Sequence, residues 1–328
     1  MNKLHESDAE LIRIPGSNSV LAVTTDNIVE EIESGLYKDP YLIGWMTVMV
    51  NVSDISAVGA SPLGLLLNES LVPSMDRKYL AELQRGIDEA CMTAGICVLG
   101  GDTNYSPKFQ IGACALGIIN DGTIISRMGG EPGDFVYSSG VLGGGNAFAL
   151  SSFSSNSGDS KFLFKPAPRL KEGSLIRRYA SNCMDTSDGL ISTLDQLMRL
   201  NNYGITIEKG CCDFVHPTAI QLCKNAGFPE WLLLAGIHGE FELVFTVSQG
   251  IKKSFLSEAE AINWKPLQIG EITEQNELKI NINNEFYIID SGKIRNMFDE
   301  SCGEIKKYVS GLIEMHQDLI SNKQKVKS

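Results

Sequence analysis

The chain has 328 residues, 43% of them apolar, so it can bury a sizeable core and most naturally forms two domains. Its 40 acidic and 28 basic residues give a formal charge of -12, which disfavours nucleic acid and anionic membranes as partners. The charged N-terminus lacks a signal-like apolar stretch, and the eight cysteines form no C-x-x-C pair. We therefore expect a cytoplasmic protein whose cysteines are buried, reduced thiols.

The first half of the chain alternates strand-like and helix-like runs, which is typical of an α/β domain. Short apolar and β-rich runs predict strands at 19–25, 63–73, 96–103 and 109–119. Apolar residues at three- and four-residue spacing predict helices at 39–60 and 76–95, the second ending at Gly95. Asp26 therefore follows a strand, and Asp54 lies near the end of a helix.

Glycine and proline in GGEPGD, at 129–134, predict a domain boundary near Gly133, so that the two domains span 1–133 and 134–328. GVLGGGN (140–146) predicts a tight strand-to-helix turn, and the Ser-rich stretch 151–162 predicts a surface loop. The second domain is also α/β. Its predicted helices are 166–180, 187–201, 216–227 and the chain's end from Glu304, and its predicted strands are 204–210, 241–247, 265–272 and 278–290.

Six aspartates lie at predicted strand or helix ends among small residues: Asp8, Asp26, Asp54, Asp102, Asp185 and Asp188. Taken singly, each is also explained as a turn residue, a helix cap or a solvent charge. If they converge, their repulsion raises their pKa values unless cations lie between them. Hard oxygen ligands of this kind suit magnesium bound together with nucleotide phosphates. The set as a whole predicts a site for several magnesium ions.

The ordered motifs ESDAE, TTDN, NVSD, GGDT, KPAPRL and MDTSDGL carry a family resemblance. Over roughly residues 6–275 the chain resembles thiamine-monophosphate kinase. That family lies within the superfamily of aminoimidazole-ribonucleotide synthetase, selenophosphate synthetase and hydrogenase-maturation protein E. The resemblance implies a two-domain α/β (α+β) fold, with an N-terminal domain that forms a barrel in a homodimer and a C-terminal domain that closes over the site. It also implies transfer of the γ-phosphoryl group of ATP to thiamine monophosphate, in thiamine biosynthesis.

Matching positions carry the family's roles into this chain. The implied magnesium ligands are Asp8, Thr24, Thr25, Asp26, Asp54, Asp102, Asp185 and Asp188. The implied ATP contacts are Gly101, Asp102, Arg127 and Ser187, and the implied catalytic residues are Asp54, Asp102 and Asp188. Positioning and charge neutralisation are sufficient for such a transfer, so no covalent enzyme intermediate is needed.

The departures from the family pattern concern mainly the acceptor. Glu6 and Ser7 replace a Gly-Asp pair in the opening motif, and Gly239 stands where the family has a substrate-contacting glutamate. The residues nearest to the family's acceptor contacts are Glu33 and Glu240. Another acceptor, another synthetase of the superfamily and a non-catalytic nucleotide-binding homologue therefore stay open. Magnesium-dependent consumption of ATP distinguishes an enzyme from a binding protein.

Two further features have an ordinary structural interpretation. His238, beside a buried strand, is expected to be a hydrogen-bonded structural residue rather than a general base. Cys211 and Cys212 lie in an apolar context and are expected to be inert thiols.

Overall fold

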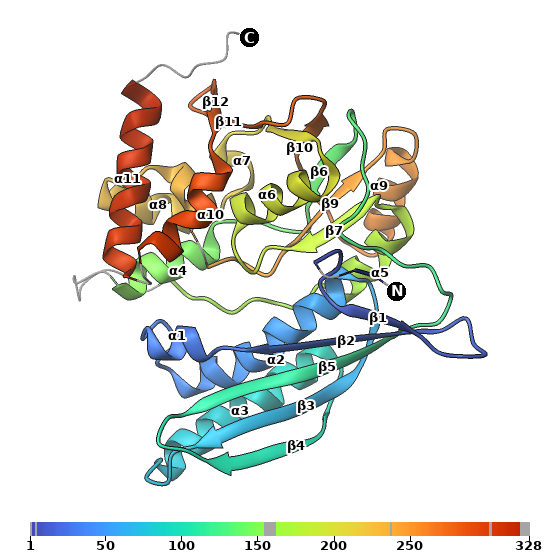
Figure 1. Ribbon diagram of the computed structural model, residues 1–328, viewed down its shortest axis with the longest axis vertical. Helices are drawn as coiled ribbons and strands as arrows, with labels where there is room; N and C mark the ends of the chain where they lie inside the picture. Colours follow the sequence, from blue (N-terminus) through green and yellow to red (C-terminus); the bar gives the residue numbers. More distant parts are fainter. Residues whose placement is uncertain (1, 4, 154–161, 237, 302–303, 322–328) are drawn as a thin grey trace. The chain divides into compact units, whose positions relative to one another are not determined.

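The computed structural model describes residues 2–3, 5–153, 162–236, 238–301 and 304–321, and it contains two compact units (Figure 1). The first unit comprises 1–127, 165–178 and 183–185, and the second comprises 128–164, 179–182 and 186–328. Both combine helices with a sheet, so the predicted α/β class is confirmed. The sequence placed one boundary near Gly133, whereas the chain leaves the first unit after Arg127 and returns to it twice.

The sheet of the first unit has five strands in the order β1-β2-β5-β3-β4. They are β1 (Glu10–Arg13), β2 (Val20–Asn27), β3 (Ser61–Leu71), β4 (Val98–Tyr105) and β5 (Gln110–Ile119). β3 and β4 pair in parallel, whereas the other neighbours in this sheet are antiparallel. The sheet is open within one chain, and its edge strand β4 is exposed along its whole length.

Two long helices, α2 (Pro40–Ala57) and α3 (Arg77–Ala94), pack against each other, and α2 also packs on β2 and β5. α2 begins at Asp39, whose carboxylate accepts a hydrogen bond from the Tyr41 backbone N–H at 3.2 Å. Most of α2 is buried, as its nearly continuous apolar composition predicts. The end of α3 predicted at Gly95 is confirmed, because Gly95 adopts the left-handed conformation (φ 69°) at the C-cap. A short helix, α1 (Val29–Glu33), follows β2.

α2 and α3 cross at two glycines. A Cβ on Gly44 would lie 2.1 Å from the carbonyl oxygen of Leu83, and a Cβ on Gly86 would lie 2.1 Å from the carbonyl oxygen of Tyr41. Because only glycine leaves room for this approach, the two backbones are in direct contact. The crossing fixes α2, which carries Asp54, against its neighbour.

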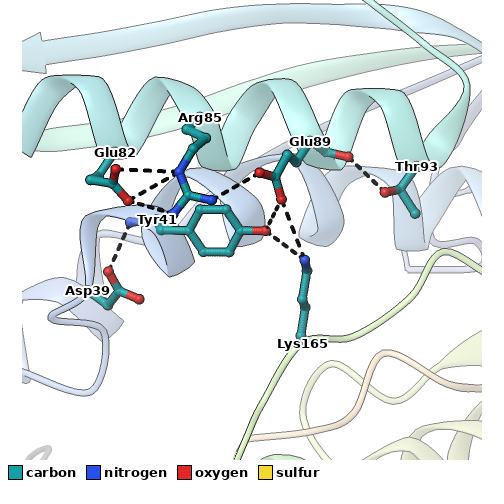
Figure 2. A network of polar contacts seen from close by, with 7 residues as sticks. All are labelled: Asp39, Tyr41, Glu82, Arg85, Glu89, Thr93 and Lys165. Carbon is teal, nitrogen blue, oxygen red and sulfur yellow. Dashed lines mark hydrogen bonds and ion pairs between the residues drawn. The ribbon is translucent and has the colours of Figure 1, made fainter.

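A network of polar contacts lies beside the first turns of α2 (Figure 2). Arg85 on α3 donates to Glu89 at 3.0 Å, and its guanidinium carbon lies 4.2 Å from the centre of the Tyr41 ring. Lys165 begins the segment that returns to the first unit. Its Nζ donates to the Tyr41 hydroxyl at 2.6 Å and lies 3.9 Å from the centre of the Trp45 ring. Lys165 Nζ also lies 3.8 Å from Glu89 Oε2 on α3, so the returning segment contacts both helices.

The second sheet has seven strands in the order β12-β11-β8-β10-β6-β9-β7. They are β6 (Phe135–Ser138), β7 (Asn182–Asp185), β8 (Gly204–Ile207), β9 (Leu243–Val247), β10 (Leu267–Thr273), β11 (Leu278–Ile282) and β12 (Glu285–Ile289). Four aromatic rings form part of its core: Tyr137, Phe245, Phe255 and Trp264, whose neighbouring centroids lie 5.6 to 6.0 Å apart. Burial of these large rings stabilises the unit.

The second unit also contains several helices. They are α4 (Gly144–Phe153), α6 (Leu190–Asn201), α7 (Cys211–Phe214), α8 (Pro217–Ala226), η1 (Glu230–Leu234), α9 (Lys252–Ala261), α10 (Ser291–Glu300) and α11 (Ile305–Ser321). α4, α8 and η1 pack together, and α10 contacts both α6 and α11. α5 (Leu170–Tyr179) lies almost wholly in the segment that rejoins the first unit. The strand-to-helix turn predicted at 140–146 is confirmed, because β6 ends at Ser138 and α4 begins at Gly144.

Three sequence-based expectations need correction. The strand expected over 278–290 is a hairpin, because Asn283 and Asn284 both have positive φ and make a two-residue turn between β11 and β12. The first residues of the stretch 151–162 belong to α4, and 154–161 lie outside the described residues. Among the described cysteines, Cys97 and Cys212 are exposed rather than buried.

None of the helices in the described part of the chain is long and apolar enough to span a membrane.

Candidate active site

Three of the predicted metal-binding aspartates come together in the first unit. One carboxylate oxygen from each of Asp8, Asp54 and Asp185 lies within 4.8 Å of the others. Asp8 precedes β1, Asp54 lies on the last turns of α2, and Asp185 ends β7. Residues far apart in the sequence therefore meet at one point of the fold.

Hydroxyl groups orient two of these carboxylates. The Thr24 hydroxyl on β2 donates to Oδ2 of Asp54 at 2.5 Å, and the Ser53 hydroxyl on α2 donates to Oδ2 of Asp185 at 2.5 Å. Asn51, also on α2, fixes β2 beside the helix, because its side-chain oxygen accepts from the backbone N–H of Asp26 at 3.0 Å. The sequence analysis missed Ser53 and Asn51. Asn51 lies three residues before Asp54, on the same helix face, and this spacing was the available signal. Ser53 directly precedes Asp54 in the NVSD motif, and helical spacing gave no signal for it.

Arg127 supplies positive charge beside the cluster. Its Nη2 donates to Oδ1 of Asp8 at 3.0 Å. The side chain of Asp8 is 1% exposed and that of Arg127 15%, so solvent screens this ion pair weakly. Arg127 was predicted to contact ATP, and here it lies among the carboxylates that were predicted to bind metal.

The electrostatics of the cluster favour a bound cation. Burial raises the pKa of Asp8 to about 6, an effect that Arg127 opposes and Asp185 reinforces. Burial, followed by repulsion from Asp185 and Asp8, holds the pKa of Asp54 well above its usual range. The second oxygen of Asp8, Oδ2, is buried and has no hydrogen-bond partner among the described residues. An orphaned carboxylate oxygen within a set of hard oxygen donors fits Mg²⁺.

The other predicted residues of β2 lie next to this cluster. Asp26 is exposed, yet its charge contributes to the raised pKa of Asp54, after burial and the two nearer aspartates. The Thr25 hydroxyl donates across the sheet to the backbone oxygen of Ala113 at 3.0 Å. The hydroxyl proton of Thr25 is therefore used in a hydrogen bond to β5.

Asp102 and Gly101 do not join the cluster within one chain. Asp102 lies on β4 and pairs with Asn68 of β3, which pairs with Gly112 of β5, which in turn pairs with Asn27 of β2. Three strand spacings separate Asp102 from β2, or roughly 14 Å. Its carboxylate accepts a hydrogen bond from the Asn104 side chain at 2.7 Å. At Gly101 a Cβ would lie 1.9 Å from the carbonyl oxygen of Leu67, so the close pairing of β3 and β4 requires glycine.

Ser187 and Asp188 follow Asp185 in the sequence but belong to the second unit. They form the turn between β7 and α6, where Asp188 is exposed. The backbone oxygen of Ser187 accepts a hydrogen bond from the N–H of Gly239 at 2.9 Å. A Cβ on Gly239 would lie 1.4 Å from the carbonyl oxygen of Thr186, so no side chain fits there. The backbone around Gly239 thus fills the space that a side chain would need.

The two residues predicted on the acceptor side lie in different settings. Glu33, on α1, is exposed and accepts a hydrogen bond from Lys108 Nζ at 2.8 Å. Glu240 is buried, and its Oε1 accepts from the backbone N–H of Gly145 at 3.3 Å, at the start of α4. Burial raises the pKa of Glu240 to about 8, so this carboxyl group is mostly protonated at neutral pH. His238 is also buried, and burial lowers its pKa to about 4.

Comparisons with known proteins give a consistent family pattern. Residues 6–119 match the family described as AIR synthase related protein, N-terminal domain. A thiamine-monophosphate kinase from Methanospirillum hungatei is 30% identical over 81% of this chain and 86% of its own length.

Solved structures share the fold of this chain. AaThiL complexed with AMPPCP and TMP is 22% identical with a TM-score of 0.73, over 85% of this chain and 88% of its own. The hydrogenase maturation protein HypE of E. coli is 21% identical with a TM-score of 0.69, over 82% of this chain and 85% of its own.

Proposed function

We propose the function of this chain from one premise: it belongs to the thiamine-monophosphate kinase family. The chain is an ATP-dependent kinase that phosphorylates thiamine monophosphate, and it serves thiamine biosynthesis. One structural observation carries this reading. Asp8, Asp54 and Asp185, which lie in three motifs of the family pattern, meet with their oxygens within 4.8 Å. The fold by itself does not decide the activity, because HypE shares it.

Magnesium is the cation that we propose for the cluster. Asp8, Asp54 and Asp185 would hold it, and Thr24, Thr25, Asp26, Asp102 and Asp188 are the further candidates from the motifs. Mg²⁺ bound there would neutralise phosphate charge and polarise the transferred phosphoryl group. The support is the raised pKa of Asp54 together with the orphaned oxygen of Asp8, both of which a divalent cation would relieve.

The chain's own residues then orient the reactants. The hydroxyls of Thr24 and Ser53 hold the carboxylates of Asp54 and Asp185 in fixed directions. We propose that Arg127 donates to phosphate oxygens of ATP, for which its planar fork of N–H groups is suited. Gly101, Asp102 and Ser187 are our further candidates for nucleotide contacts, and Glu33 and Glu240 are the candidates for the acceptor. Transfer between two phosphates held in line requires no covalent intermediate.

A homodimer is the assembly that we propose, in the cytoplasm where ATP is available. The support is the outer edge of the first sheet, where β4 pairs with no further strand among the described residues and exposes Leu99 (51%) and Tyr105 (75%). An exposed apolar edge strand favours pairing with another chain. Leu63 and Leu66 of β3 are also exposed, at 46% and 40%, and extend the apolar surface.

The experiment that tests this function is ADP release with Mg²⁺, ATP and a panel of acceptors headed by thiamine monophosphate. Asp54→Ala and Asp102→Ala should abolish turnover, whereas Asp88→Ala, which removes an exposed carboxylate from α3, should retain it. ADP release only with another acceptor would keep the mechanism and change the substrate. Stabilisation by Mg-ATP without ADP release would indicate the non-catalytic nucleotide-binding protein instead.

A further inference from the structure

Arg127 is a counterion for the whole acidic cluster. Its guanidinium hydrogen-bonds Asp8, and it also interacts electrostatically with Asp185 and Asp54. Its backbone N–H donates to the carbonyl oxygen of Glu6 at 2.8 Å, which ties the residue to the segment that carries Asp8. The cluster therefore contains a built-in positive charge in the absence of a metal ion.

The carboxylate of Asp8 has two different oxygens. Oδ1 accepts the hydrogen bond from Arg127, whereas Oδ2 is buried without a hydrogen-bond partner among the described residues. A divalent cation held by Asp8, Asp54 and Asp185 would share the Asp8 carboxylate with the guanidinium. Two positive charges on one buried carboxylate repel each other strongly, because little water screens them.

We propose that Arg127 and the divalent cation compete for Asp8. Without nucleotide, the guanidinium occupies Asp8 and keeps the affinity for free cations low. A nucleotide phosphate then takes over the guanidinium, which releases Asp8 to the cation. Binding of cation and nucleotide is then cooperative, because each draws one partner away from the repulsion between guanidinium and cation at Asp8. The inference rests on the proposed magnesium site, and it assigns Arg127 a second role as the residue that restrains metal binding.

The test measures Mn²⁺ binding to the full chain by electron paramagnetic resonance, without nucleotide and at about 0.15 M KCl, where distant charges are screened. Arg127→Gln should bind Mn²⁺ about tenfold more tightly than the wild type, because its competitor is gone. Arg127→Lys, which keeps the charge, should gain much less. The control is Arg177→Gln, which loses the same charge from the ion pair with Asp121 and should leave Mn²⁺ affinity unchanged.

A second substitution locates the competition. In an Asp8→Asn background, Arg127→Gln should give no gain in Mn²⁺ affinity over Asp8→Asn alone, because the contested carboxylate is already absent. Arg127→Gln should also lower the melting temperature without metal and show a larger rise on adding Mg²⁺ than the wild type. Equal or weaker Mn²⁺ binding by Arg127→Gln would overturn the competition and leave the metal site standing. Absence of Mn²⁺ binding in every variant, the wild type included, would overturn the metal site itself.

A measurement on the wild type covers the case in which Arg127→Gln does not fold. The Nε–H signal of Arg127 can be followed by nuclear magnetic resonance and assigned by its loss in Arg127→Lys. Addition of Mg²⁺ with a non-hydrolysable ATP analogue should change its exchange with water, as the guanidinium leaves Asp8. An unchanged Nε–H signal at saturating Mg²⁺ and ATP analogue would contradict the proposed transfer of the guanidinium from Asp8 to the nucleotide phosphate.

Discussion

At the scale of single residues, two neutral hydroxyls set the directions of the carboxylates. Ser53→Ala removes the donor to Asp185 and leaves the helix itself intact, so we expect kcat/KM to fall about 10- to 100-fold at limiting Mg²⁺. The requirement for Mg²⁺ should rise, because an unoriented carboxylate is a poorer ligand. The matched control is Ser56→Ala, one turn further along α2, whose hydroxyl donates to the Val52 backbone oxygen. An equal loss in both variants would point to helix packing instead.

Glu240 gives a pH-dependent prediction. Its pKa is raised by burial from 4.5 to about 8, so the folded state keeps a proton that the unfolded state loses. Stability should therefore fall as pH rises between these values, by up to about 1.4 kcal/mol per pH unit. Glu240→Gln can still accept the Gly145 N–H bond and should remove this contribution, which leaves the part of the slope that the raised pKa values of Asp8 and Asp54 produce. Urea unfolding at pH 5 and pH 8 measures it, with exposed Glu274→Gln as the control. An unchanged slope would show that another group titrates.

The sequence predicted the residues of the acidic cluster but not how each is used. Asp8, Asp54 and Asp185 lie in short motifs that can be found along the chain. That Asp102 lies three strands away depends on the pairing of β2, β5, β3 and β4, which no motif encodes. The burial of Glu240 depends on Gly145, 95 residues away. Long-range packing decides such features, and a single sequence carries little signal for it.

At the scale of elements, the crossing of α2 and α3 determines how firmly Asp54 is held. Gly44→Ala would place a Cβ 2.1 Å from the Leu83 carbonyl oxygen, which forces the helices apart. We expect a loss of about 1–3 kcal/mol of unfolding free energy, despite the better helix propensity of alanine. Gly250→Ala, with open space around the site, should change stability little. Chemical denaturation of both variants measures the difference in stability. Similar denaturation midpoints for Gly44→Ala and Gly250→Ala would refute a close crossing of α2 and α3.

Predicted elements match the structure best where one physical signal is strong. Helix α3 shows amphipathic spacing, an Asp76 cap and a left-handed Gly95, and its limits agree with the prediction. β1, α9 and α10 were not predicted. β1 has four residues, which is too short for a clear alternating pattern. Tertiary pairing and packing, rather than local propensity, stabilise elements of this kind.

At the scale of the whole molecule, the position of Asp102 bears on the assembly. It lies roughly 14 Å from β2 on the exposed edge strand β4, so the cluster of its own chain is out of reach of its carboxylate. If Asp102 takes part in catalysis, as its motif implies, a second chain that pairs at this apolar edge can bring its own acidic cluster to Asp102. Each site of such a homodimer would then combine Asp54 of one chain with Asp102 of the other.

Complementation between two inactive variants tests this arrangement. Asp54→Ala and Asp102→Ala chains with different tags are co-expressed, and the mixed dimer is purified through both tags. If the site is shared, one site of the mixed dimer loses both aspartates and the other keeps both, so about half of the wild-type activity per dimer should return. If each chain uses its own Asp102, both sites stay defective and the mixed dimer is inactive. Leu99→Lys, which places a charge on the edge of β4, should yield monomers in size-exclusion chromatography and abolish the complementation.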